Sequence, residues 1–129
     1  MPPPARLLTA LLLLVSVLAL PARAQTTITY VNGDTNATAY DTTSGAPYTL
    51  TIASGSATHS GALTGSGGIT KTGAGTLALT NAITSSGNVT VSGGSLSTNR
   101  NNYNGAVLVE GAGSVLTLAH GSNSRRVGN

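Results

Sequence analysis

The chain has 129 residues, a formal net charge of +3 and few large side chains. It contains no Trp, Phe or Cys and only four Tyr, which argues against a conventional globular core and excludes a disulfide framework. Two of the basic residues, Arg6 and Arg23, lie in a segment that we expect to be removed. The rest then carries a net charge of about +1, which gives no case for binding nucleic acid or anionic membranes.

Residues 1–24 have the three parts of a secretory signal peptide. Arg6 supplies the positive charge, residues 7–20 form an apolar run, and Ala22-Arg23-Ala24 is a small-x-small cleavage site. The run is shorter than the roughly 20 apolar residues of a membrane span, which favours a signal peptide over an anchor. We therefore predict contact with the inner-membrane secretion machinery and signal peptidase, a mature chain that starts at Gln25, and export to the periplasm, cell surface or medium.

Residues 25–59 form a region of short predicted strands. Alternating apolar and β-branched residues predict strands over 27–31, 39–41 and 48–52. Asn32-Gly33-Asp34 is a turn signal, and Pro47 stands where a strand can begin without a backbone donor. We treat 25–59 as an N-terminal β-strand region.

Residues 60–98 contain the clearest pattern of the chain. Apolar residues alternate with small polar ones in short bursts, and glycine pairs separate the bursts. Period-2 alternation indicates strands with one buried face, and regular glycine indicates tight turns between them. The pattern predicts a β-solenoid of about four or five coils with roughly 20–25 residues each. The residues that we expect to point inward are Leu77, Leu79, Val89, Val91 and Leu96.

Residues 99–129 look like a second, degenerate repeat. We predict strands over 106–109 and 115–118, a Gly111-Ala112-Gly113 turn and a loop over 100–105. The chain reaches Gly128-Asn129 after a polar run without an obvious cap for the open sheet edges. This leads us to expect a truncated repeat and a fragment of a longer protein.

The segment from Gly65 to Leu96 resembles the autotransporter-associated β-strand repeat. That repeat typically reads Gly-x-Gly-x-Leu-x-Lys-x-Gly-x-Gly-Thr-Leu-x-Leu, followed by a variable turn and Thr-x-Val-x-x-Gly-x-Leu. Residues 81–88 replace the usual Gly-x-Asn-x-Tyr-x-Gly run of the variable part. The matching positions are Gly65, Gly67, Ile69, Lys71, Gly73, Gly75, Thr76, Leu77, Leu79, Val91, Gly94 and Leu96.

The resemblance implies type V secretion, in which a C-terminal β-barrel carries a β-helical passenger across the outer membrane. No such translocator is present in this chain, so it would belong to a separate or missing part. The fold class that we expect is all-β: a right-handed parallel β-helix or β-solenoid of a few short coils after a cleaved signal peptide. The family repeat is structural and transfers no catalytic residues.

Residues that could carry chemistry are scarce. His59 and Asp41 with a serine would imitate a catalytic triad, but serine is too abundant for this to be specific, and we expect His59 and His120 to be exposed turn residues. The acids Asp34, Asp41 and Glu110 are scattered, and no calcium nonapeptide is present. Gly73 to Ala78 imitates a dinucleotide fingerprint but precedes a strand pattern instead of a helix. We expect no catalytic, cofactor or metal site.

Three functional interpretations follow. The first is an exported, non-catalytic β-helical passenger, or stalk, of an autotransporter-like bacterial surface protein. The second is an adhesin-type module that binds glycans or host surfaces through outward Thr, Asn and Tyr. The least favoured is a fragment of a β-helical polysaccharide-degrading enzyme, because such sites need clustered carboxylates. Tyr30, Tyr40, Tyr48 and Tyr103 could line a sugar groove, but we expect them to be ladder or surface residues.

Overall fold

The structure is a computed structural model that describes residues 25–43, 47–81, 83–98, 105–120 and 123–128. The predicted signal peptide (1–24), Tyr103 and most of the predicted loop 100–105 lie outside these residues. The described part is all-β and consists of thirteen strands. These are β1 (Thr26–Tyr30), β2 (Thr35–Asn36), β3 (Tyr40–Asp41), β4 (Tyr48–Ile52), β5 (Ser56–His59), β6 (Leu63–Thr64), β7 (Ile69–Thr72), β8 (Thr76–Leu79), β9 (Val89–Val91), β10 (Ser95–Thr98), β11 (Val107–Val109), β12 (Val115–His120) and β13 (Asn123–Gly128).

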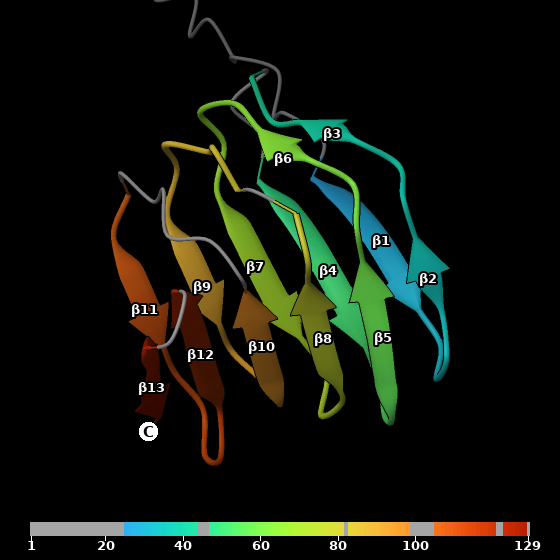
Figure 1. The fold of residues 1–129 in the computed structure, drawn as a ribbon, viewed down its shortest axis with the longest axis vertical. Helices are drawn as coiled ribbons and strands as arrows, with labels where there is room; N and C mark the ends of the chain where they lie inside the picture. The colour runs from blue at the N-terminus through green and yellow to red at the C-terminus, as the bar shows by residue number, and fades with distance from the viewer. Residues whose placement is uncertain (1–24, 44–46, 82, 99–104, 121–122, 129) are drawn as a thin grey trace, which may run out of the picture.

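The strands wind into a β-solenoid whose two main sheets face each other (Figure 1). Sheet A has the order β1-β4-β7-β9-β11, and sheet B has the order β13-β12-β10-β8-β5-β2. A third, two-stranded sheet of β3 and β6 closes the corner between them. Each strand from β1 to β12 pairs in parallel with a strand one coil away, whereas β13 pairs antiparallel with the preceding strand β12. The predicted solenoid is confirmed, with about four turns.

The number of residues between paired strands falls along sheet A. In sheet A, one row of partners joins Thr26, Tyr48, Ile69, Val89 and Val107, so successive offsets are 22, 21, 20 and 18 residues. The first two coils have a strand at the third corner, whereas the third coil has only the isolated bridge from Ile83 to Leu63. The expected range of roughly 20–25 residues per coil fits the early coils and overestimates the last one.

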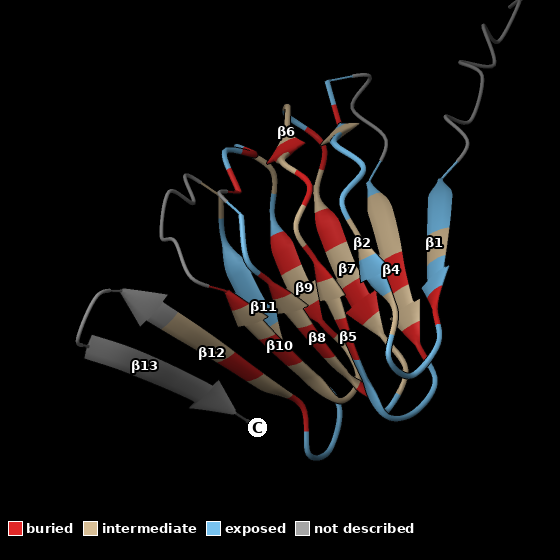
Figure 2. Ribbon diagram, turned by 45° about the vertical axis from the view of Figure 1, so that its right-hand side comes forward, coloured by how far each residue is buried: buried red, intermediate tan, exposed pale blue. Residues whose placement is uncertain are grey.

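The core is a stack of apolar rows between the sheets, visible as the bands of buried residues in Figure 2. In sheet B, one row joins Ala57, Leu77, Leu96 and Leu116. The five residues that the sequence predicted to point inward are all buried. Removing a leucine side chain from water contributes roughly 1.5–3 kcal/mol, so thin layers of this kind can hold a chain that lacks large aromatic residues.

Two expectations about exposed ends and residues were wrong. The polar run near the C-terminus forms β13, which pairs antiparallel with β12 along its whole length and so covers that edge of sheet B. His59 is a fully buried strand residue, because it shares a face with Ala57 in the alternation of β5. His120 also lies in a strand, at the end of β12, and not in a turn.

Candidate functional site

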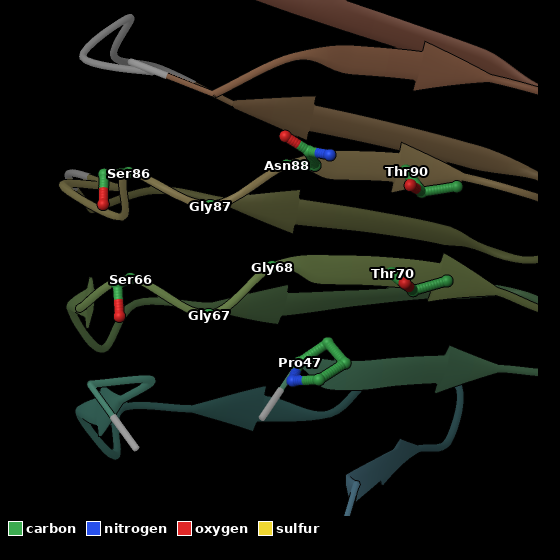
Figure 3. A pocket seen from close by; sticks show the side chains of 9 residues that line it. All are labelled: Pro47, Ser66, Gly67, Gly68, Thr70, Ser86, Gly87, Asn88 and Thr90. Atoms are coloured by element: carbon green, nitrogen blue, oxygen red, sulfur yellow. The ribbon is translucent and has the colours of Figure 1, made fainter. Parts of the chain in front are cut away.

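A shallow polar groove of about 510 Å³ lies on the surface of the solenoid. It lies where the chain enters sheet A in the second, third and fourth coils, and Figure 3 shows that its lining repeats from coil to coil. Ser66 lies beside Ser86, Gly67 beside Gly87, and Thr70 beside Thr90. The full lining is Pro47, Ser66, Gly67, Gly68, Thr70, Ser86, Gly87, Asn88 and Thr90.

Glycine is required at this corner because the coils approach closely there. A Cβ atom placed on Gly87 would lie 2.2 Å from the carbonyl oxygen of Gly67, and one on Gly105 would lie 2.2 Å from that of Gly87. Real Cβ atoms do not come so close to backbone, so the glycines form a column that side chains would push apart. The Ser85 hydroxyl adds to the corner by donating a 2.7 Å hydrogen bond to the Gly67 carbonyl.

The groove can hold a polar, uncharged ligand, but it has no group that transfers a proton. Its side chains are hydroxyls, one amide and one proline ring, and none of them titrates near neutral pH. General acid–base chemistry needs a titratable group within hydrogen-bond reach of the reacting atom. The groove therefore offers hydrogen-bonding groups to a ligand and no titratable side chain.

The imagined triad residues do not come together. His59 is buried, and its Nδ1 lies 3.0 Å from the Tyr30 hydroxyl. Asp41 is exposed and accepts hydrogen bonds from the backbone N–H and the hydroxyl of Thr43, which lower the pKa of its carboxyl group. The two residues thus have different partners and different environments, and the structure gives no support to a triad.

His59 is instead the centre of an aromatic cluster in the first two coils. Its ring stacks on Tyr40 with centroids 5.5 Å apart and meets Tyr30 edge-on at 6.1 Å, while Tyr40 packs on Tyr48 at 5.4 Å. Burial lowers the pKa of the imidazole, and among the described atoms its Nε2 has no hydrogen-bond partner. None of the three tyrosines lines the groove, so Tyr30, Tyr40 and Tyr48 serve the core and its rim.

Lys71 is a buried charged residue that sequence reasoning did not place in the core. It occupies an inward position of β7, in the same row as Leu50 and Val91. Its ammonium group donates to the carbonyls of Thr72, Gly73 and Gly93 at 2.9, 2.8 and 3.0 Å. Burial lowers the pKa of this amine to about 8, and the three carbonyl acceptors oppose that shift because they favour the charged form.

The signal for Lys71 was present in the alternation of Ile69, Lys71 and the flanking threonines, which places the lysine on the buried face. Lysine is rarely fully buried unless it is paired, so the residue type argued against a buried position for Lys71. The hydrogen bonds join turns of two neighbouring coils, and Lys71 therefore acts as a structural clip between them.

We also looked among the described residues for the features of a metal site and of a dinucleotide site. No three His, Cys, Asp or Glu side chains group there as a metal site would need. The glycines from Gly73 to Gly75 lead into strand β8, as predicted, and not into the helix of a dinucleotide site. No described helix could cross a membrane.

Comparison with protein-family models, with curated proteins and with solved structures gives no significant match for this chain. The likeness to the autotransporter repeat therefore rests on the motif residues alone.

Proposed function

We propose that this chain is an exported, non-catalytic β-helical passenger, or stalk, segment of an autotransporter-like bacterial surface protein, wound as a right-handed helix. The main support for the proposal is that the residues of the repeat motif hold neighbouring coils together. Lys71 clips two turns, Gly73 has a φ of 77° that suits glycine, and Leu77 and Leu79 fill the core. The motif residues are thus used for stacking coils, as a stalk requires.

The predicted leader adds the second support, because a passenger must first cross the inner membrane. The three acidic residues do not support an enzyme. Asp34 and Asp41 lie in the first coil, whereas Glu110 lies after β11. The described residues contain no cluster of three His, Cys, Asp or Glu side chains. Paired carboxylates on one face would be needed for polysaccharide hydrolysis.

The experiment is to express the full chain in a Gram-negative bacterium, fused ahead of an outer-membrane β-barrel translocator. We expect an N-terminus at Gln25 by mass spectrometry and labelling of intact cells by an antibody to the chain. The matched control is Leu13→Arg, which places a charge in the apolar run and should leave the product unprocessed inside the cell. Recovery of the unaltered chain in the cytoplasm with residues 1–24 intact would reject the proposal.

A second candidate is an adhesin-type module, and the polar groove favours it. The hydroxyls of Thr70 and Thr90 and the amide of Asn88 suit the hydroxyl groups of an uncharged glycan, and Pro47 offers a small apolar surface. A glycan array with the purified chain tests this candidate. Binding that Thr90→Val or Asn88→Ala abolishes would support it, and an array without signal would leave the stalk alone.

A further inference from the structure

The outer face of sheet A has threonine at alternate positions of successive strands. Three strands contain the tripeptides Thr27-Ile28-Thr29, Thr49-Leu50-Thr51 and Thr70-Lys71-Thr72, and the fourth continues with Thr90-Val91-Ser92. The middle residues of the second, third and fourth are buried, so the flanking hydroxyl residues face outward. We call these outward residues the threonine lattice: Thr27, Thr29, Thr49, Thr51, Thr70, Thr72, Thr90 and Ser92.

The strand register places the threonines directly beside one another. One row joins Thr27, Thr49, Thr70 and Thr90, and the other joins Thr29, Thr51 and Thr72, with Ser92 at the next outward position after Val91. Neighbours in a row are separated by the strand spacing of about 4.8 Å, and the two rows by about 6.6 Å, two residues along a strand. The backbone positions of these residues therefore form a regular two-dimensional net, from which hydroxyl and methyl groups project.

The side chains of the net are held in place. Threonine is branched at Cβ and has few accessible χ1 states, which reduces the freedom of each hydroxyl. Thr51 and Thr72 also share a 2.7 Å hydrogen bond between their hydroxyls. Figure 3 shows Thr70 and Thr90 in the same orientation on adjacent coils. The face is therefore ordered before any ligand arrives.

Sheet B shows that strand propensity alone does not produce this net. Threonine suits any half-exposed strand, so both outer faces should be equally rich in it if propensity decided the sequence. The outward residues of sheet B also include hydroxyl side chains, but four of nine are threonine, against seven of eight in the threonine lattice, and Ala78 and Val115 interrupt the rows. Its two rows contain Thr35, Thr58, Ala78, Ser97 and Thr117, and Ser56, Thr76, Ser95 and Val115.

The composition of the threonine lattice also narrows the class of ligand. None of its eight side chains is charged, so a charged ligand finds no counter-charge there. Protein partners are usually anchored by Trp, Tyr or Arg in the middle of an interface, and the lattice has none of them. A ligand that matches the threonine lattice is therefore an uncharged surface. It also repeats in two directions and forms hydrogen bonds.

We propose that the threonine lattice binds ice. An ice face is an uncharged net of water oxygens whose two repeats are of the same order as the spacings of the lattice. Hydroxyls can replace water molecules as hydrogen-bond partners, and water bridging two such groups is nearly as favourable as a direct bond. The methyl groups of the same threonines add apolar area to the face and favour release of less ordered water. This activity goes beyond a stalk and does not depend on it.

The lattice has a defined end. In the fifth coil Leu108 occupies the position of Thr90 and is half-exposed, and the exposed Glu110 follows it. The proposed surface therefore covers the first four coils of sheet A and not the last.

The experiment measures partitioning of the purified full chain into slowly growing ice, together with inhibition of ice recrystallisation. We expect the chain to concentrate in the ice, and Thr51→Tyr to reduce the partition coefficient by about tenfold or more, since tenfold corresponds to ~1.4 kcal/mol of binding free energy. Thr51 is chosen because it does not line the polar groove. The matched control is Ala78→Tyr, an outward tyrosine in the middle of sheet B, which should leave partitioning unchanged.

Circular dichroism and thermal unfolding are recorded for each variant, and Thr49→Tyr in the other row replaces Thr51→Tyr if the latter fails to fold. Exclusion of the folded chain from ice, to the same degree as a neutral carrier protein, would overturn the proposal. Equal loss in Ala78→Tyr would also overturn it, because the effect would not belong to sheet A. Retention on microcrystalline cellulose without retention in ice would assign the lattice to a polysaccharide surface instead.

Discussion

Lys71 and His59 are both buried in the core of this solenoid, and their surroundings differ. Lys71 has three carbonyl acceptors for its ammonium group, whereas buried His59 has one described partner and an unpaired Nε2. The long stem of lysine carries the charge from an inward strand position to the turn after β7. The short imidazole arm ends among aromatic rings and strand backbone that is already paired. For this pair of residues, the reach of the lysine stem to a turn separates the satisfied polar group from the one with an unpaired nitrogen.

The largest expected effect comes from truncating the satisfied residue. Lys71→Ala should lower the free energy of unfolding by about 3–5 kcal/mol, because it leaves a cavity beside Leu50 and Val91 and removes the donor of three carbonyls. Lys71→Met keeps most of the stem and should cost about 1–2 kcal/mol, since loss of the hydrogen bonds is partly offset by removal of a buried charge. Urea unfolding measures both. Equal losses for Ala and Met would contradict the role of the stem.

Alkaline pH should separate the two residues next. The pKa of Lys71 is about 8 in the folded chain and near its ordinary 10.5 in the unfolded chain, so the unfolded chain binds more protons between these values. Stability from this residue should therefore rise as pH rises from 8, and Lys71→Met should lack the rise. Above pH 10 the buried Tyr30, whose pKa burial raises, acts in the opposite direction, so pH 8–10 is the window for the comparison. A flat difference between wild type and Lys71→Met would contradict the lowered pKa.

At acidic pH, we expect the protonation of His59 to lower the stability of the fold. Because burial lowers its pKa below the ordinary 6.5, the unfolded chain takes up more protons as pH falls through 6.5, and stability is lost. His59→Leu continues the apolar row of Leu79 and should shift the acid unfolding midpoint to lower pH. Unfolding followed by circular dichroism between pH 7 and 4 tests this. The same acid midpoint for both proteins would show that His59 titrates normally.

The smallest effect is expected from the hydroxyl beside His59. Tyr30→Phe removes the 3.0 Å contact to Nδ1 and leaves a second buried nitrogen unpaired, at a cost of about 1–2 kcal/mol. Tyr48→Phe is the matched control, because the Tyr48 hydroxyl makes only a long, exposed 3.4 Å contact to the Asp41 carbonyl. That control should stay within about 0.5 kcal/mol of wild type by thermal unfolding. A larger loss in Tyr48→Phe than in Tyr30→Phe would contradict the comparison.

The strands and the core were accessible from sequence because period-2 alternation identifies both. Leu77, Leu79 and Val91 were assigned inward on this basis, and all are buried. The same rule places His59 and Lys71 inward, but their residue types argue for exposure. Their hydrogen-bond partners include groups of a neighbouring coil, the Gly93 carbonyl for Lys71 and the Tyr30 hydroxyl for His59, which the local pattern does not reveal.

The polar groove and the pairing of β13 at the edge of sheet B could not be predicted from the sequence, because both depend on contacts between segments that the local pattern does not specify. Gly67 and Gly87 signal turns, but the column that they form depends on the register between coils. The polar residues of β13 carry no apolar alternation, and the strand pairs only because β12 offers an edge. Local pattern predicts a strand, while its partner and direction are decided by the assembled stack.

The shortening of the sheet A offsets also bears on how such a chain can change in evolution. A duplicated segment is tolerated only when its ends meet the corners of the coils on either side. In sheet A, offsets of 22, 21, 20 and 18 residues mean that a copy of the third coil fits beside its original, whereas a copy of the first beside the last would leave four residues to bulge from that sheet. We therefore expect this molecule to lengthen by tandem duplication of adjacent units of about 20 codons. Exchange of units between the first and the last coil should be the least tolerated.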